Sequence, residues 1–404
     1  MQIDATRRSV DLDPRDAQFY ENPYPFYRRL QANCPVFKWE QYGHWCFSRH
    51  DDVNTLLRDR RFGRQILHVA SREELGWPEP ADHIRVFTEH EKHSLLELEP
   101  PVHTRLRGLI NRAFLSRQVE RLRPFIIKLS NDLIDRFQDQ DEAELLENFA
   151  TPIPVFVICE LLGVPNQMAR QFLAWSHDHV AMYMAKRDRM IEDKAVVAVT
   201  AFSDYMRQLI AERRKNPGTD LLSELIRAES EGQKLSEDEL VTTAILVLNA
   251  GHEATVHATG NGIKALLERG ITGPITPELV DEILRFDAPL HMFTRYALED
   301  LDYNGLQLKK GEVVGLMLGA ANHDASRFPV PDEFQPARTP NPHVSFGAGI
   351  HFCIGAPLAR LEMLLALEVL FARLPKMSLA GQPRYKDVYH FHGLEALRVN
   401  LRHG

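Results

Sequence analysis

One short stretch near the C-terminus constrains this chain more than any other. Cys353 follows a glycine-containing loop and precedes an apolar run with helical spacing that includes Leu358 and Leu361. A thiol at a helix N-terminus meets unpaired backbone N–H groups and the positive end of the helix dipole, which favour its thiolate form. Gly355 lets a flat partner lie close to the backbone. A thiolate in this position is a soft metal ligand of the kind that binds haem iron, although a lone cysteine at such a turn also fits a buried core thiol.

The spacing around this cysteine decides between the two interpretations. Phe346, Gly349, Cys353 and Gly355 fill the pattern Phe-x-x-Gly-x-x-x-Cys-x-Gly, which resembles the haem-binding loop of cytochrome P450 enzymes. The resemblance implies a mainly α fold with a small β-rich region, in which haem lies between a long central helix and the helix following the cysteine loop. It also implies that the cofactor is haem b (iron protoporphyrin IX), with Cys353 as iron ligand and Phe346, Gly355 and the propionate donor His351 around it.

A second motif lies near residue 100. Pro100 and Pro101 open a predicted helix on which His103 and Arg107 lie one turn apart on the same face. Two donors so placed can bind one carboxylate, and haem carries two propionates. Taken alone, the pair also fits a solvated basic face. The resemblance implies that His103 and Arg107 bind propionates, together with Arg295 further along the chain.

A very long helix is predicted from the capping box that begins at Ser236 to about Arg269. Its middle resembles the oxygen-binding segment of the P450 family, with the acid at Glu253, but the usual threonine position holds Ala254. Thr255 comes one residue later, rotated by roughly 100° about the helix axis. The resemblance implies catalytic roles for these three positions. The alternative is a glycine-kinked core helix with one exposed acid.

A helix capped by Thr276 is predicted to carry Glu282 and Arg285, which are spaced to pair. Such pairs are common on helices, and it is the order of the motifs that makes this one resemble the P450 Glu-x-x-Arg, with Arg338 as its third member. The resemblance also places a small group of residues along the substrate pocket: Ala250, Leu290 and Phe293.

Local patterns add a few further expectations. Two alternating runs, 36–39 and 44–48, are separated by a turn containing Gly43 and predict a β-hairpin. Residues 389–400 suggest a terminal hairpin whose tip, near 392–394, touches substrate. Residues 1–20 are expected to form a loosely ordered arm.

Composition sets the broad class. The chain has 404 residues, of which 44% are hydrophobic and 26% charged, and the resemblance implies a single domain over residues 1–404. The net charge of −8 argues against a nucleic-acid binder. Four cysteines without paired spacing fit a reducing compartment. No apolar run reaches membrane-spanning length, so we expect a soluble, cytoplasmic protein without a membrane contact.

The function implied by the resemblance is a haem-thiolate monooxygenase that hydroxylates a small hydrophobic substrate. The sequence contains no glycine fingerprint for a flavin or a nicotinamide. We therefore expect no flavin in this chain, and electrons from a ferredoxin and a ferredoxin reductase. Two alternatives stay open: a peroxide-dependent haem-thiolate enzyme, which Ala254 brings into consideration, and a non-catalytic haem-binding sensor.

Overall fold

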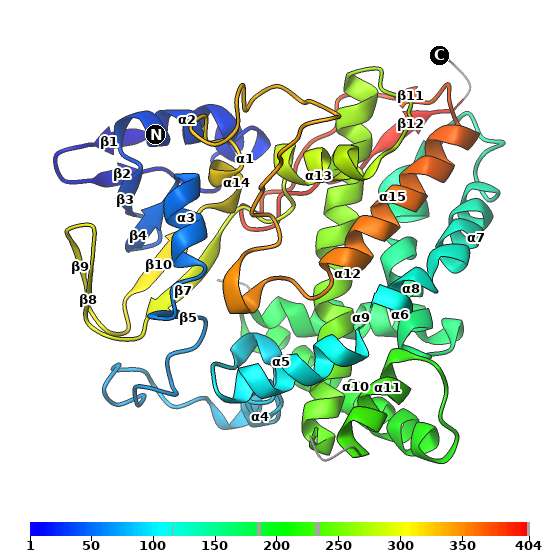
Figure 1. Ribbon diagram of the computed structural model, residues 1–404, viewed down its shortest axis with the longest axis horizontal. Helices are drawn as coiled ribbons and strands as arrows, with labels where there is room; N and C mark the ends of the chain where they lie inside the picture. Colours follow the sequence, from blue (N-terminus) through cyan, green and yellow to red (C-terminus); the bar gives the residue numbers. More distant parts are fainter. Residues whose placement is uncertain (115, 184–186, 231–234, 402–404) are drawn as a thin grey trace. The chain divides into compact units, whose positions relative to one another are not determined.

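The computed structural model describes residues 1–114, 116–183, 187–230 and 235–401 (Figure 1). They fall into two units. The first unit contains residues 1–69, 127–151 and 254–404, and the second contains residues 70–126 and 152–253. The long helix α12 (Glu237–Glu268) begins in the second unit and ends in the first. The expected class, mainly α with a small β-rich region, is confirmed. The prediction of one domain over the whole chain stays a prediction.

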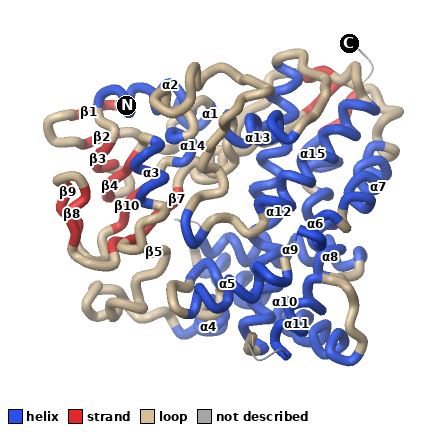
Figure 2. Tube along the Cα trace, in the orientation of Figure 1, coloured by secondary structure: helices blue, strands red, loops and turns tan. Residues whose placement is uncertain are grey.

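Within the described chain, all strands belong to the first unit, and Figure 2 shows them in red. The largest sheet has seven strands in the order β1 (Gln2–Asp4), β2 (Ser9–Asp11), β3 (Val36–Trp39), β4 (His44–Phe47), β10 (Val313–Leu316), β7 (Phe293–Ala297) and β5 (Phe62–Gly63). A second sheet joins β11 (Ser378–Leu379), β12 (Arg398–Asn400) and β6 (Glu142–Glu144), and a third pairs β8 (Leu301–Tyr303) with β9 (Leu306–Leu308).

The predicted hairpin is present as β3 and β4, which pair antiparallel with Val36 opposite Phe47. In β3 the side chains of Phe37 and Trp39 are buried while Lys38 between them is exposed, which is the alternation of a half-buried strand. β10 then pairs parallel to β4 and antiparallel to β7. This register places Arg295 of β7 opposite Val314, in the interior of the sheet.

The expectation of a loosely ordered arm over residues 1–20 is wrong. These residues form β1, β2 and α1 (Ala17–Glu21), and the side chains of Val10 and Phe19 are fully buried. The indole Nε1 of Trp39 donates to the carbonyl of Leu12 at 2.7 Å. The segment is ordered because its backbone pairs with β3 and its apolar side chains enter the core.

The first unit also contains the helices that carry most of the sequence motifs. They are α2 (Tyr24–Asn33), α3 (His50–Leu56), most of α7 (Arg123–Ile134), α13 (Pro277–Phe286), α14 (Leu318–Ala321) and α15 (Ala356–Arg373). The N-terminus of α13 agrees with its predicted cap, since the Thr276 hydroxyl accepts from the Leu279 N–H at 3.2 Å.

Within its described residues, the regular elements of the second unit are all helices, joined by loops and turns. Its helices are α4 (Arg85–Glu91), α5 (Val102–Ala113), α6 (Ser116–Glu120), α8 (Pro152–Leu162), α9 (Ala169–Val180), α10 (Arg189–Lys215) and α11 (Leu221–Ser230). The predicted capping box of α12 is complete, because Ser236 Oγ accepts from the Glu239 N–H and Glu239 Oε2 accepts from the Ser236 N–H. Among the helices of the described residues, none combines the length and apolar character needed to cross a bilayer.

Candidate active site

The loop before α15 is held in one shape by its backbone. The Cys353 N–H donates to the Phe346 carbonyl at 3.0 Å and so closes the loop. Gly347 and Gly349 have φ values of +69° and +71°, a region that side chains disfavour. At Gly349 a Cβ would also lie only 2.4 Å from the carbonyl oxygen of Leu57. The loop therefore packs tightly against the end of α3. Position 349 requires glycine both because its φ is positive and because a Cβ has no room there.

Cys353 lies three residues before the first residue of α15 and is half-buried. A Cβ on Gly355 would have the Cys353 Sγ, 3.8 Å away, as its only close neighbour, so the space beside the sulfur is open. A soft sulfur donor at a helix N-terminus, with room beside it for a flat group, fits the axial ligand of a haem.

The side of the loop that carries Phe346 is supported by charged groups. The Arg360 guanidinium lies 4.6 Å from the centroid of the Phe346 ring, and its Nε donates to Asp281 of α13 at 2.7 Å. His343 contacts the same carboxylate at 3.2 Å. Burial acts to raise the pKa of Asp281, but the hydrogen bonds of His343 and Arg360 outweigh it and hold that pKa below its usual range. Asp281 is therefore charged at neutral pH and ties α13 to α15.

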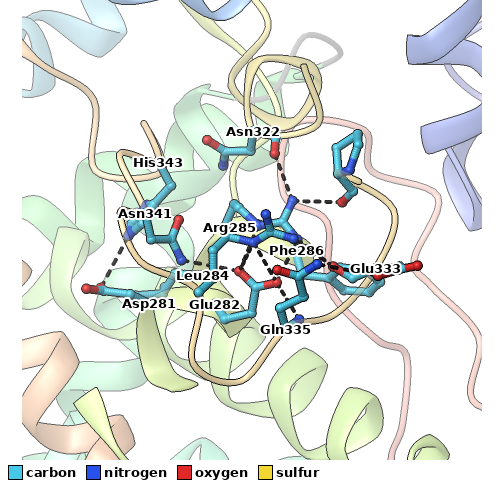
Figure 3. Close-up of polar contacts among 12 residues, drawn as sticks. Asp281, Glu282, Leu284, Arg285, Phe286, Asn322, Glu333, Gln335, Asn341 and His343 are labelled. Atoms are coloured by element: carbon cyan, nitrogen blue, oxygen red, sulfur yellow. Dashed lines mark hydrogen bonds and ion pairs between the residues drawn. The ribbon is translucent and has the colours of Figure 1, made fainter. Parts of the chain in front are cut away.

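The Glu282 and Arg285 side chains meet in the core of the first unit, as Figure 3 shows. Arg338 is buried there too and joins them. Both oxygens of Glu282 accept from Arg285 at 2.8 Å, and both also accept from Arg338 Nε, at 3.0 and 3.2 Å. The remaining guanidinium N–H groups donate to backbone carbonyls of Asn322, Pro329, Val330, Pro331 and Glu333. The cluster thus pins the segment 329–338, which leads into the cysteine loop, onto α13.

The proposed propionate donors lie on different elements. Arg295 of β7 is buried and donates from Nη1 to the Thr294 carbonyl at 2.8 Å, and His351 lies half-buried in the cysteine loop. In the second unit, His103 of α5 is buried, whereas Arg107 one turn later is half-buried and donates from Nε to Asn111 at 3.2 Å. His103 and Arg107 share one face of α5, as the spacing predicted.

The segment of α12 around residue 254 is continuous helix. Gly251 lies against α8, because a Cβ there would meet Ile158 Cδ1 at 2.7 Å. Glu253 and Ala254 are half-buried, whereas Thr255 is buried. No unwinding at Gly251 turns Thr255 toward the position of Ala254 in the described helix.

The residues assigned to the substrate pocket differ in exposure. Ala250 is exposed, while Leu290 and Phe293 are half-buried. Leu290 forms an isolated antiparallel bridge with Phe391. The predicted bounds of the terminal hairpin, 389–400, are wrong, since β12 pairs with β11 and β6, and the antiparallel pairing that is present sets Tyr385 opposite Leu394. The expected tip is also buried, with His392 packed in the core, so it is Phe391 that remains half-buried beside Leu290.

A sequence model of the cytochrome P450 family matches residues 77–269 and 274–376 of this chain. The chain belongs to the cytochrome P450 family. P450 proteins bind haem, and the relatives named as hydroxylases support the class of monooxygenase, an oxidoreductase that incorporates oxygen. The fold is accordingly that of a P450, with the family's placement of haem between the long central helix, here α12, and the helix after the cysteine loop, here α15.

Known P450 proteins resemble nearly the whole of this chain. The polyketide biosynthesis cytochrome P450 PksS of Bacillus subtilis is 35% identical, over 96% of this chain and 98% of its own. The vitamin D(3) 25-hydroxylase of Pseudonocardia autotrophica is 36% identical, over 95% and 94%. Among solved structures, P450BioI in complex with an acyl carrier protein carrying hexadec-9Z-enoic acid superposes with a TM-score of 0.86 at 34% identity, covering 95% of this chain and 100% of that one.

Several residues that support this P450 site carry no signal in the sequence. Asn341 Nδ2 donates to Glu282 at 3.2 Å, and the Gln335 N–H donates to the same carboxylate at 2.8 Å. These partners lie more than fifty positions away and follow no helical or strand period. The hydrogen bond between Arg360 and Asp281 is also not predicted from the sequence. The one sequence signal for it is that Asp281 is a carboxylate directly before Glu282.

Proposed function

We propose that this P450 hydroxylates a small hydrophobic substrate with dioxygen, using electrons from a separate ferredoxin and ferredoxin reductase. The observation that carries the proposal is the closed, glycine-dependent loop that presents Cys353 at the N-terminus of α15. The proposed cofactor is haem b with Cys353 as its axial ligand, and when bound it supplies the redox and dioxygen chemistry. We further propose that the protein works in the cytoplasm and carries no flavin.

The chain's own residues have distinct roles in this proposal. The helix N-terminus favours the Cys353 thiolate, and Gly355 leaves space beside it. His103, Arg107, Arg295 and His351 bind the propionates by charge-assisted hydrogen bonds. Glu253 holds and moves protons through its carboxylate, and Ala254 leaves room for water next to it. The Glu282 cluster acts at a distance by fixing the segment before the loop.

Ligation by Cys353 is tested by spectroscopy. The reduced protein with carbon monoxide is expected to show the red-shifted absorption band of thiolate-bound haem, and Cys353→His is expected to abolish it. Cys159→Ala is the matched control, because it removes a thiol that is buried in α8. If the band survives in Cys353→His, another residue binds the iron and the proposal fails.

Electron delivery is proposed to use the exposed face near Arg112 at the end of α5. Arg360 is a second arginine that could belong to this docking face, but it already contacts Asp281 and Phe346. Its substitution would disturb the cysteine loop as well as the docking face, so Arg112 is the residue to change. Arg112→Glu is expected to slow reduction by ferredoxin without changing the carbon monoxide spectrum. An unchanged reduction rate would place the docking face elsewhere.

The substrate class is proposed from the relatives. P450BioI is seen with an acyl carrier protein bearing a long acyl chain, PksS is named for polyketide biosynthesis, and another neighbour, CYP267B1, is complexed with myristic acid. We propose a substrate with a long apolar segment, supplied free or on a carrier protein. The two forms are separated by titrating the protein with a fatty acid and with the same acyl group on a carrier protein. Tighter binding of the carrier form, seen as a haem spectral shift, would favour the tethered substrate.

Peroxide use is the second candidate, and Ala254 is the observation that favours it. Alanine cannot donate or accept a hydrogen bond, and Thr255 is buried on another face of α12. Product formation with hydrogen peroxide alone, at a rate comparable to that with ferredoxin, reductase and nicotinamide, would support this candidate. Product only with the electron donors supports the monooxygenase, and no product with either would leave the sensor alternative.

A further inference from the structure

A cluster of two histidines and a glutamate lies in the second unit, among residues to which the P450 reaction gives no role. His90 and Glu91 are the last two residues of α4, and His179 lies in the last turn of α9. Each of the three offers one ligand atom, and all three atoms lie within 4.8 Å of one another. His179 is buried, while His90 and Glu91 are half-buried. Glu91 and His179 are 88 positions apart in the sequence, so only the fold brings these donors together.

The spacing within the cluster already suits a metal ion. His179 Nε2 and Glu91 Oε1 are 3.3 Å apart. In a tetrahedral site with metal–ligand bonds of about 2.1 Å, neighbouring ligand atoms lie about 3.4 Å apart. This pair therefore needs almost no movement, and the ligand atom of His90 lies within 4.8 Å of both.

Neighbouring hydroxyl groups orient the donors. Tyr183 donates from its hydroxyl to Glu91 Oε2 at 2.5 Å, which leaves Oε1 directed at His179. The hydroxyl of Thr242 lies 3.5 Å from His90 Nδ1. Hydrogen bonds of this kind to a ligand's outer atoms are typical of metal sites, where they fix the direction of the first ligands.

The hydrogen bonds already present do not by themselves satisfy the cluster. His179 Nδ1 is buried and has no hydrogen-bond partner among the described residues. The ring lies tilted against Phe87, with 4.8 Å between centroids, and Phe87 belongs to a small apolar core with Ile84 and Met182. The polar neighbours of His179 Nε2 are Glu91 Oε1 at 3.3 Å and the Tyr183 hydroxyl at 3.5 Å. An imidazole buried against apolar side chains gains a further strong partner when a cation binds.

A second group with the same composition provides a contrast. Asp287, His291 and His392 also come within reach of one another, in the core of the first unit. There, however, the hydroxyls of Tyr24 and Tyr385 donate to Asp287, and Tyr27 bonds to His291 Nδ1 at 2.6 Å. The Tyr385 ring stacks on His392 at 3.9 Å. Tyrosine hydroxyls thus engage both oxygens of Asp287, whereas Tyr183 engages only one oxygen of Glu91, so the Glu91 group is the better candidate for a metal ion.

We propose that His90, Glu91 and His179 bind one divalent transition-metal ion of the zinc type, which joins the end of α4 to the end of α9. Two imidazoles and one carboxylate are a ligand set that Zn²⁺ accepts, with its fourth position left to water. The ion is distinct from the haem iron and plays no part in the proposed hydroxylation. Its effect is to tie α4 to α9, between which the described residues already show the ion pair of Glu91 with His179 and the ring contacts of His179 with Phe87 and His90.

Metal content provides the first test. Holoprotein without an affinity tag is equilibrated with Zn²⁺, passed through a desalting column, and analysed for zinc and iron. The expected result is one zinc per chain, with iron counted separately. His90→Gln, Glu91→Gln and His179→Gln are each expected to lose the zinc while keeping the iron. His177→Gln is the matched control, because His177 is exposed on the same helix, α9.

Stability and exchange give an independent readout that does not depend on the buried His179. Zinc is expected to raise the melting temperature of the wild type in a concentration-dependent manner, and to slow amide exchange in both 82–93 and 176–183. Neither change is expected in His90→Gln or Glu91→Gln, whose folding is checked by circular dichroism.

Three results would overturn the proposal. The first is no retained zinc in the wild type. The second is zinc retained equally in the three variants, which would place it elsewhere, including the Asp287 group. The third is zinc that leaves exchange in α4 and α9 unchanged.

Discussion

At the scale of single residues, two buried glutamates of the first unit differ in whether hydrogen-bonding partners compensate their charge. Glu282 is fully buried, yet both its oxygens are held by two arginines and an asparagine. Removing one partner of such a buried pair typically costs about 3–5 kcal/mol, because a charge is left without compensation. Glu362 of α15 is also buried, but its Oε2 has no hydrogen-bond partner in the part of the chain that the structure describes. Burial raises the pKa of Glu362 to about 8.

Glu362 should therefore make stability depend on pH. Its carboxyl is protonated in the folded chain at neutral pH, whereas in the unfolded chain it ionises near pH 4.3. Its contribution to the free energy of unfolding is complete below that lower pKa and is lost as the pH rises through about 8. Glu362→Gln removes this titration. Between pH 5 and 7.5, the unfolding free energy of the variant minus that of the wild type is expected to increase by roughly 1.4 kcal/mol per pH unit.

Urea unfolding at several pH values measures the difference between the two proteins. Glu368→Gln is the control, since Glu368 lies exposed on the same helix and should show no such trend. Parallel pH curves for the wild type and Glu362→Gln would show that Glu362 is charged in the folded protein.

At the scale of elements, the cysteine loop depends on one glycine for two separable reasons. Gly349→Ala would combine a left-handed backbone with a clash against the Leu57 carbonyl. Gly305, in the turn between β8 and β9, has φ +82° but nothing within 4 Å of its Cβ position. Gly305→Ala therefore reports the backbone cost alone, about 1–2 kcal/mol. Gly349→Ala is expected to cost clearly more and to reduce the fraction of chains that retain haem.

Thermal unfolding and the haem-to-protein absorbance ratio test this pair. Equal losses in the two variants, with haem content unchanged, would mean that the loop can move away from α3 without disturbing Cys353.

Elements with local signals were predictable from the sequence, and elements without them were not. The Ser236 capping box and the Thr276 cap appear as expected, since each is satisfied by atoms three residues away. The strands of residues 2–11 were missed because three-residue strands carry almost no periodicity and form only when distant β3 pairs with them. The prediction of a hairpin tip near His392 was wrong for a similar reason. Asn261 of α12 donates to the His392 carbonyl at 2.9 Å, and no local sequence pattern indicates this contact.

The residues of interest for function likewise fall into those that a sequence pattern predicts and those that none predicts. Cys353 and the Glu282, Arg285 and Arg338 cluster were accessible because fixed spacings in a fixed order resemble a family. The His90, Glu91 and His179 cluster was not, because its donors come from two helices joined only by the fold.

At the scale of the whole molecule, cofactor binding should stabilise the folded chain, because a group that binds only the folded state shifts the equilibrium toward it. A charge-assisted hydrogen bond to a propionate is worth about 1.5–3 kcal/mol. Arg107→Ala is therefore expected to weaken haem binding about ten- to hundredfold and to lower the melting temperature of the holoprotein, leaving that of the apoprotein nearly unchanged.

Transfer of haem to apomyoglobin measures the loss for Arg107→Ala. Arg112→Ala, an exposed arginine on the same helix, should retain haem like the wild type. If both variants lose haem alike, the effect comes from the charge of α5 as a whole and not from a propionate contact by Arg107.

The whole catalytic cycle also depends on how protons reach the oxygen-binding segment without a threonine at 254. The helix is continuous through this segment, and Thr255 is buried on its own face, so the local unwinding that would bring it into the missing role is not seen. Two substitutes remain: a polar group on the substrate, and water ordered by the half-buried Glu253. In the proposed reaction, Glu253 or the substrate itself, and not Thr255, then supplies the protons.

Turnover of a substrate identified by spectral screening then distinguishes the two side chains. Glu253→Gln keeps the shape but not the charge, and is expected to slow turnover by about 2–4 kcal/mol of transition-state stabilisation, roughly thirty- to a thousandfold. Thr255→Ala is expected to change turnover less than about threefold, although it can lower stability because the side chain is buried. Electrons should couple well to product with the true substrate and be lost as peroxide with analogues that lack its polar group. A large loss of coupling in Thr255→Ala, with Glu253→Gln nearly unchanged, would instead assign the proton-delivering role to Thr255 and require α12 to open at Gly251 during the reaction.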